Sequence, residues 1–206
     1  MASKVIHLDR SHIEQAVDIF ADAFTTDPLF EYIFSPSNQD YADCLREFFK
    51  FSCEVRYLLD WPMLGLQDDV GKIVGAAGVS LPGDTPWPQA LTDIYRQLKE
   101  FTGPESAARF DKMAALADPL SPPQPFHELG VIGVLTGEQG HGYGGKLVQA
   151  VDQLSQDHPD STGVYLWTQN PQNVTLYSRF GYNVTWKRAY SEKDKLYLWG
   201  MFRPNP

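Results

Sequence analysis

The sequence has no long hydrophobic run and little basic charge, and each shortage excludes a class of protein. Its apolar runs are a few residues long, whereas a helix that crosses a bilayer needs about 20. We therefore expect no membrane-spanning helix, and no secretory signal in residues 1–15, which hold no apolar stretch. The 17 Lys and Arg against 26 Asp and Glu give a net charge of −9. Such a surface repels phosphate backbones and anionic lipids and attracts cations such as amines, so we expect neither nucleic acid nor membrane as a partner.

Cysteine is also scarce, with Cys44 and Cys53 as the only two. Both fall in one predicted helix, where nine residues separate them by about 13 Å along the axis, too far for a disulfide. This indicates a reducing compartment, and we expect the cytoplasm. Two cysteines without clustered histidines also predict no metal site.

The 206 residues, of which 43% are hydrophobic, suffice for one domain spanning residues 1–206. Hydrophobic periodicity predicts an alternation of strands and helices, with residues 11–14 as the capping box of the first helix. The expected strands are 4–8, 63–67, 73–81, 128–134, 163–168, 182–190 and 196–202; the expected helices are one from residue 13 to about 27, then 41–57, 90–101, 106–117, 142–158 and 173–179. This order predicts an α/β fold in which a mixed sheet carries helices on its faces.

One stretch has the pattern of a ligand-binding site. An apolar strand that ends at Val134 is followed by a glycine-dense loop, and the loop leads into an amphipathic helix. Glycines let successive backbone N–H groups point at one spot, and the helix adds its unpaired N-terminal donors and positive dipole end. Together these hold a pyrophosphate without a cationic side chain. The loop residues are Gln139, Gly140, His141, Gly142, Tyr143, Gly144 and Gly145.

Residues 140–145 also satisfy GxGxxG, the fingerprint of dinucleotide-binding folds. In those folds the first glycine follows its strand almost at once, and the next strand ends in an acidic residue that holds the ribose. Here five residues separate Val134 from Gly140, and the next strand ends in Thr-Gln-Asn. The context disfavours a dinucleotide site.

The segment Gln139-x-x-Gly142-x-Gly144 resembles the (Arg/Gln)-x-x-Gly-x-(Gly/Ala) acetyl-CoA loop of the GNAT superfamily of N-acetyltransferases. A second stretch, from Asn170 through Asn173, Leu-Tyr177 and Phe-Gly181-Tyr182, is similar to the family's second signature. The resemblance covers residues 125–203. It implies a mostly antiparallel central sheet flanked by helices, with acetyl-CoA as cosubstrate and no metal.

The resemblance also implies which residues bind the cosubstrate and which catalyse. The backbone of Ile132, Gly133 and Val134 is expected to pair with the pantetheine. Tyr177 is expected to protonate the departing thiolate; the alternative is a core tyrosine. Glu128 stands where some family members carry a general base; the alternative is a solvated strand-entry residue. Strand alternation places Glu128, Gly130, Ile132 and Val134 on one face and the weaker candidate His127 on the other.

Four further polar residues could contact the cosubstrate, and all but His141 keep two interpretations. Asn170 and Asn173 either bind the cosubstrate or form the turn and N-cap of the 173–179 helix. His141 is expected to lend a ring contact at most. Lys146, one turn into its helix, either touches a phosphate or is solvated.

Two segments bear on the acceptor. Residues 82–126 insert a helical pair before the acetyl-CoA strand, either as a lid over the acceptor or as a packing subdomain or dimer surface. Residues 24–34 are expected to form a second wall of the acceptor site, where family members place it. We expect transfer of acetyl from acetyl-CoA to the primary amine of a small molecule by direct attack. The alternatives are a protein or peptide N-acetyltransferase and a non-catalytic acetyl-CoA sensor; a homodimer stays open.

Overall fold

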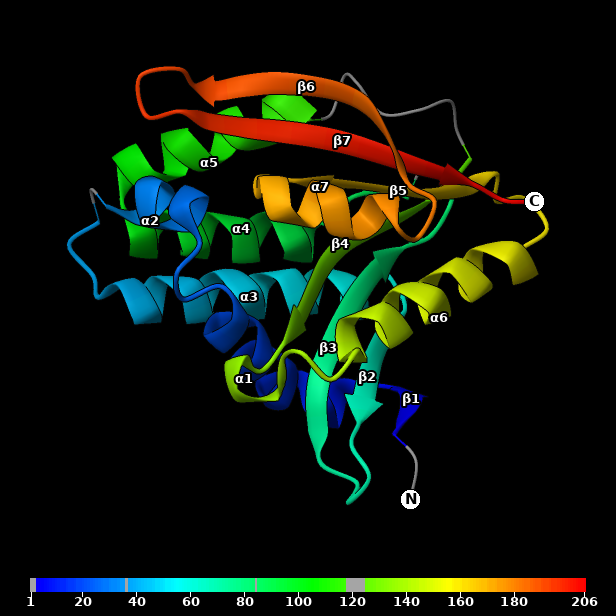
Figure 1. Cartoon of the computed structure of the whole chain (residues 1–206). Coiled ribbons are helices and arrows are strands. Elements are labelled where there is room, and N and C mark those ends of the chain that lie inside the picture. The colour runs from blue at the N-terminus through cyan, green and yellow to red at the C-terminus, as the bar shows by residue number, and fades with distance from the viewer. Residues whose placement is uncertain (1–2, 36, 84, 118–124) are drawn as a thin grey trace.

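A seven-stranded sheet forms the centre of the chain (Figure 1), of which the computed structural model describes residues 3–35, 37–83, 85–117 and 125–206. The strands lie in the order β1-β2-β3-β4-β5-β7-β6. Only β4 and β5 pair in parallel among the described strands. The bounds are β1 Lys4–His7, β2 Met63–Gln67, β3 Ile73–Ser80, β4 His127–Val134, β5 Gly163–Thr168, β6 Asn183–Ser191 and β7 Leu196–Pro204. The predicted α/β class with a mixed, mostly antiparallel sheet is confirmed.

Helices cover both faces of this sheet (Figure 1). On one face, α6 packs against β2 to β5, and the side chains of α6 and α7 share one buried cluster with the sheet. On the other face, α1 packs on β3 and β4, and α3 packs on α1. The bounds are α1 Ile13–Ala23, α2 Pro28–Phe34, α3 Tyr41–Leu58, α4 Gln89–Thr102, α5 Pro104–Ala117, α6 Tyr143–Asp157 and α7 Pro171–Ser178.

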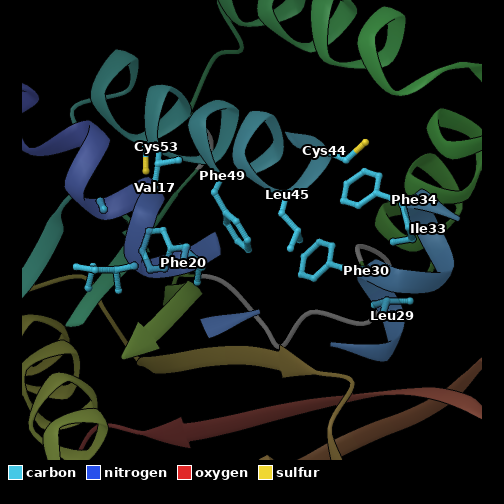
Figure 2. Packing of buried hydrophobic residues seen from close by; sticks show 14 of the residues in the cluster. Val17, Phe20, Leu29, Phe30, Ile33, Phe34, Cys44, Leu45, Phe49 and Cys53 are labelled. Atoms are coloured by element: carbon cyan, nitrogen blue, oxygen red, sulfur yellow. The ribbon is translucent and has the colours of Figure 1, made fainter. Parts of the chain in front are cut away.

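Aromatic side chains join α1, α2 and α3 into one core. Figure 2 shows Phe30 and Phe34 of α2 directed toward α3, beside Leu45 and Cys44. The rings of Phe20 and Phe49 lie 5.5 Å apart, which couples α1 to α3. Buried aromatic rings add contact energy beyond their area, so this core fixes α2 against the sheet face that carries α1.

The start of α1 differs from the prediction. A short 3-10 helix, Arg10–His12, precedes α1, and its N-cap is Asp9, whose carboxylate accepts from the backbone N–H of Ser11. His12 completes the capping box of that turn. The expectation of a Ser11–Glu14 box is therefore wrong, because Asp9 is a better-placed acceptor two residues earlier.

The chain between β3 and β4 contributes α4, which packs on α3, and α5, which packs on α4 and α2 (Figure 1). Phe110 of α5 meets Phe48 of α3 with ring centroids 5.2 Å apart. The hydroxyl of Tyr190 on β6 donates to the carbonyl of Arg109 at 2.7 Å, so α5 also supports the β6–β7 hairpin. The insertion is thus packed into the domain. The predicted helix stop at residues 122–123 lies outside the described residues.

Both cysteines lie in α3, where they are buried and free. Burial raises the pKa of the Cys53 thiol to about 12 and that of Cys44 above its ordinary value. Across the described residues, no helix is both long enough and apolar enough to cross a bilayer.

Candidate active site

The parallel strands β4 and β5 separate soon after they begin. Their pairing covers His127 with Val164 and Glu128 with Tyr165, and within the described residues it goes no further. The other edge of β4 pairs with β3 from Glu128 to Val134. From Leu129 onward, no described strand pairs with the β5-side edge of β4, so backbone groups there can bind an extended ligand, except the carbonyl of Val134, which accepts from Gln139.

A β-bulge interrupts β4 at Gly130. Gly78 pairs with Val131 and Val79 with Leu129, which leaves Gly130 without a register partner on β3. A Cβ on Gly130 would meet Arg56 of α3, whereas Val134 lies with Leu147 of α6 against Gly75. The expectation that Glu128, Gly130 and Val134 share one face is therefore wrong, because the bulge adds one residue and reverses the alternation.

The glycine-dense loop links β4 to α6 and contains two glycines with a positive φ. Gly140 and Gly142 have φ of +84° and +77°, in the left-handed region that glycine adopts without a side-chain clash. Gly142 is the N-cap of α6, whose first helical residue is Tyr143. Because Gly142 carries no capping side chain, the unpaired N–H groups of the first turn are left for a ligand.

Three contacts hold this loop in place. The side-chain amide of Gln139 donates to the carbonyl of Val134 at 3.2 Å. The backbone N–H of Thr136 donates to the carboxylate of Asp22, at the end of α1, at 2.5 Å. A Cβ on Gly145 would approach the ring of Phe180 to 2.9 Å, so a glycine is required where α6 crosses that ring. His141 is exposed and Tyr143 is partly exposed, and their ring centroids lie 5.6 Å apart.

Tyr177 lies on α7 and is buried against the α6 face of the sheet. Its ring centroid is 5.7 Å from that of Tyr182. Burial raises the pKa of the Tyr177 phenol above its ordinary value, so the hydroxyl stays protonated at neutral pH. This is the protonation state that a proton donor needs.

Glu128 and His127 face opposite sides of β4. Glu128 is half-buried at the point where β4 and β5 part. His127 is buried, and its Nδ1 lies 2.9 Å from the hydroxyl of Ser161. Burial and the neighbouring His158 lower the pKa of His127 to about 4, so the ring is neutral and belongs to a structural hydrogen-bond network.

Asn170 and Asn173 both lie at the start of α7. The side chain of Asn170 accepts from the backbone N–H of Gln172 at 2.9 Å and is the N-cap of α7. The helix begins at Pro171, two residues before the predicted start. The side-chain amide of Asn173 donates to the hydroxyl of Thr168, at the end of β5, at 3.3 Å. Both asparagines thus connect α7 to the end of β5.

Sequence reasoning missed one link across the site. The carboxylate of Asp27 caps α2, accepting from Leu29 and Phe30 at 3.0 and 3.2 Å, and it also accepts from the side-chain amide of Gln169 just after β5. Burial raises the pKa of this carboxyl. Pro28 at the first helical position is a signal that could have predicted both the cap and α2.

Other features of the described residues lie outside this site. An open pocket of about 440 Å³ lies between α1 and the β2–β3 turn, lined among others by Asp18 and Lys72, and none of the predicted site residues lines it. Within the described part of the chain, no three His, Cys, Asp or Glu side chains gather in a way that could hold a metal ion.

Comparisons with known proteins agree on one family. The model of the acetyltransferase (GNAT) family matches residues 30–182. A search of curated protein sequences gives no match. Among solved structures, a protein from Corynebacterium glutamicum described as histone acetyltransferase HPA2 and related acetyltransferase is similar at 20% identity and a TM-score of 0.74, covering 100% of this chain and 98% of that one.

Two further structures share this fold at lower identity. Arylalkylamine N-acetyltransferase 2 from Aedes aegypti has 13% identity and a TM-score of 0.71, with 99% of both chains covered. The acetyltransferase yncA from Salmonella typhimurium, solved with its cofactor acetyl-CoA, has 16% identity and a TM-score of 0.56, with 100% of this chain and 95% of that chain covered. At these identities the likeness establishes the fold.

Proposed function

The chain belongs to the GNAT acetyltransferase family, and we propose that it transfers the acetyl group of acetyl-CoA to the primary amine of a small molecule. The observation that carries the proposal is the unpaired edge of β4, which leads directly into the glycine loop at the start of α6. An extended chain with a pyrophosphate at one end and an acyl group at the other matches this arrangement.

The residues of this region fit acetyl-CoA, which supplies an activated acetyl thioester. Backbone groups of Ile132, Gly133 and Val134 would pair with the pantetheine along the open edge. The N–H groups of residues 139–145 would hold the pyrophosphate, because two left-handed glycines let the backbone turn there at the start of a helix. Asn170 and Asn173 already serve α7 and Thr168, so we assign them the support of this site.

Glu128 and Tyr177 divide the proton transfers. An ammonium acceptor must lose a proton before its nitrogen can attack, and Glu128 takes that proton and passes it to solvent. As the C–N bond forms and the C–S bond breaks, the nitrogen releases its second N–H proton to solvent. Tyr177 gives its proton to the departing thiolate and recovers one from solvent. The net reaction releases one proton, and no acyl-enzyme is formed.

The acidic character of the chain favours an amine acceptor. Its net charge is −9, and the Asp27 carboxylate lies where the α1–α2 loop meets the end of β5. Because α4 packs on α3 and α5 packs on α4, the insertion between β3 and β4 adds bulk to the face that carries α1 and α3, and we take this to favour a small amine over a peptide. Two reduced, buried cysteines are consistent with a cytoplasmic enzyme.

An acceptor panel tests this proposal. Purified protein is incubated with acetyl-CoA and either small primary amines or lysine-rich peptides; released CoA thiol is followed by colorimetry and acetylated product by mass spectrometry. We expect turnover with members of the amine set, and Glu128→Gln to remove most of it. Turnover on peptides alone would replace the small-molecule proposal with protein acetylation. Binding of acetyl-CoA without turnover on either set would favour a sensor.

A further inference from the structure

A fully buried arginine lies under the bulge of β4. Arg56, near the end of α3, is only 7% exposed, and its guanidinium occupies the space that side chains on two neighbouring strands would fill. A Cβ on Gly78 of β3 would lie 2.2 Å from Nε of Arg56, and a Cβ on Gly130 of β4 would lie 2.2 Å from Nη2. The two glycines therefore make room for the guanidinium against the sheet.

Hydrogen bonding inside α3 satisfies only part of this group. Nη1 of Arg56 donates to the carbonyl and the hydroxyl of Ser52, at 2.7 and 2.8 Å. Nε is buried without a hydrogen-bond partner among the described residues. Burying a charge with incomplete pairing costs several kcal/mol, so stability alone does not explain an arginine here.

The geometry of β4 places Glu128 on the face of the sheet where this cation lies. Leu129 packs in the α6-side cluster, so its neighbours Glu128 and Gly130 both face α3. Residues two apart on a strand are separated by about 7 Å, within the combined reach of a glutamate and the guanidinium at Gly130. Among the described residues, Glu128 is the carboxylate whose charge acts on Arg56.

Other titratable groups lie near Arg56 on α3 and near Glu128 in the sheet. On α3, the Cys53 thiol lies near Arg56, and burial raises its pKa to about 12, so it is neutral. On β5, Tyr165 stands opposite Glu128 in register. On β4, His127 faces the α6 side. Glu128 is thus the carboxylate whose charge acts on the guanidinium from the point where β4 and β5 part.

We propose that Arg56 is the positioning residue for Glu128, holding its carboxylate ionised and directed toward the incoming amine. This rests on the proposed function, in which Glu128 takes the acceptor's proton. The bulge has a role in the arrangement, because the extra residue leaves room for the guanidinium between Gly78 and Gly130 without a side chain in the way.

The pH dependence of kcat/KM separates positioning from packing. In Arg56→Met, loss of the cation makes Glu128 take up its proton at higher pH, so the acid limb of the profile moves up by about one pH unit. We expect kcat to fall about tenfold with KM for acetyl-CoA unchanged. Arg46→Met is the matched control: Arg46 also lies on α3, but it is exposed and pairs with Asp18. It should leave the profile unchanged, as should Cys53→Ala.

A double-mutant cycle and a direct titration complete the test. If Arg56 acts through Glu128, then Arg56→Met in a Glu128→Gln background costs no further activity. Additive losses with an unmoved acid limb would overturn the proposal while leaving acetyl transfer intact.

The carboxyl ¹³C resonance of Glu128, assigned with Glu128→Gln, needs no turnover. It should titrate at higher pH in Arg56→Met than in the wild type; an unmoved titration would overturn the pairing even if no acceptor is found. Should Arg56→Met fail to fold, Arg56→Lys keeps the charge, and we expect it to retain the wild-type acid limb. An upward shift in Arg56→Lys would contradict the proposal.

Discussion

The side-chain amide of Gln139 donates a hydrogen bond to the carbonyl of Val134 and so folds the glycine loop back onto the end of β4. Val134 ends the strand that we assign to acetyl-CoA, and Gln139 begins the glycine loop that we assign to the same ligand. Their bond, with that of Thr136 to Asp22, holds the N-terminus of α6 before any ligand arrives. A loop held in its binding conformation loses less entropy on binding.

The left-handed conformation of Gly142 predicts a selective loss of affinity. Any L-residue at φ of +77° is strained by about 1–2 kcal/mol, and relief of that strain would turn the first N–H groups of α6 away from the pyrophosphate. We expect Gly142→Ala to weaken acetyl-CoA binding about tenfold in calorimetry. Gly137→Ala is the control, because a Cβ there meets no atom and its φ is ordinary. Equal affinity of both variants would remove the loop from the binding site.

Substitutions of two neighbouring tyrosines should have different effects, one on catalysis and the other on stability. Tyr177→Phe keeps the buried ring and removes the proton donor, so we expect kcat to fall about 10²-fold with the melting temperature nearly unchanged. Tyr182→Phe removes a hydroxyl that donates to the buried carboxylate of Asp152 at 2.8 Å. It should lower the free energy of unfolding by about 1–3 kcal/mol and spare kcat. If Tyr177→Phe kept the wild-type kcat, Tyr177 would not be the proton donor and would be only a core residue.

Buried His127 predicts a loss of stability in weak acid. Its pKa is about 4 in the folded chain and about 6.5 when unfolded, so the unfolded chain binds more protons between those values. Stability is therefore full above pH 6.5 and falls as pH drops toward 4, by up to about 3 kcal/mol. Urea unfolding at pH 7.0 and 4.5 should show this loss in the wild type and in His141→Gln, whose histidine is exposed, and a smaller one in His127→Gln. Equal pH dependence in both variants would contradict the assignment.

Direct attack predicts that neither cysteine is needed. Cys44 and Cys53 lie on α3 with raised pKa values, poor properties for a nucleophile. The double variant Cys44→Ala, Cys53→Ala should lose stability, because it opens space in the core, and keep kcat at permissive temperature. Trapping of an acetylated cysteine by mass spectrometry of the wild type would instead establish a covalent route.

Periodicity and glycine spacing predicted most strands, the β4–loop–α6 unit and the α/β class. Periodicity and glycine spacing involve residues that are close together in the sequence, so they can be recognised in a single sequence. The bulge at Gly130 was not predicted, because a bulge depends on the register of β3 against β4, and strict alternation then misplaced Val134 relative to Glu128. Arg56 was missed for a similar reason: a helical arginine normally faces solvent, and only the two glycines on other strands reveal that it is buried.

Calorimetric titration with acetyl-CoA, with NAD as the matched ligand, tests the central claim most directly. The open edge of β4 and the glycine loop predict micromolar binding of acetyl-CoA and no heat with NAD. Binding of NAD without binding of acetyl-CoA would contradict the account, and residues 140–145 would then be a dinucleotide fingerprint.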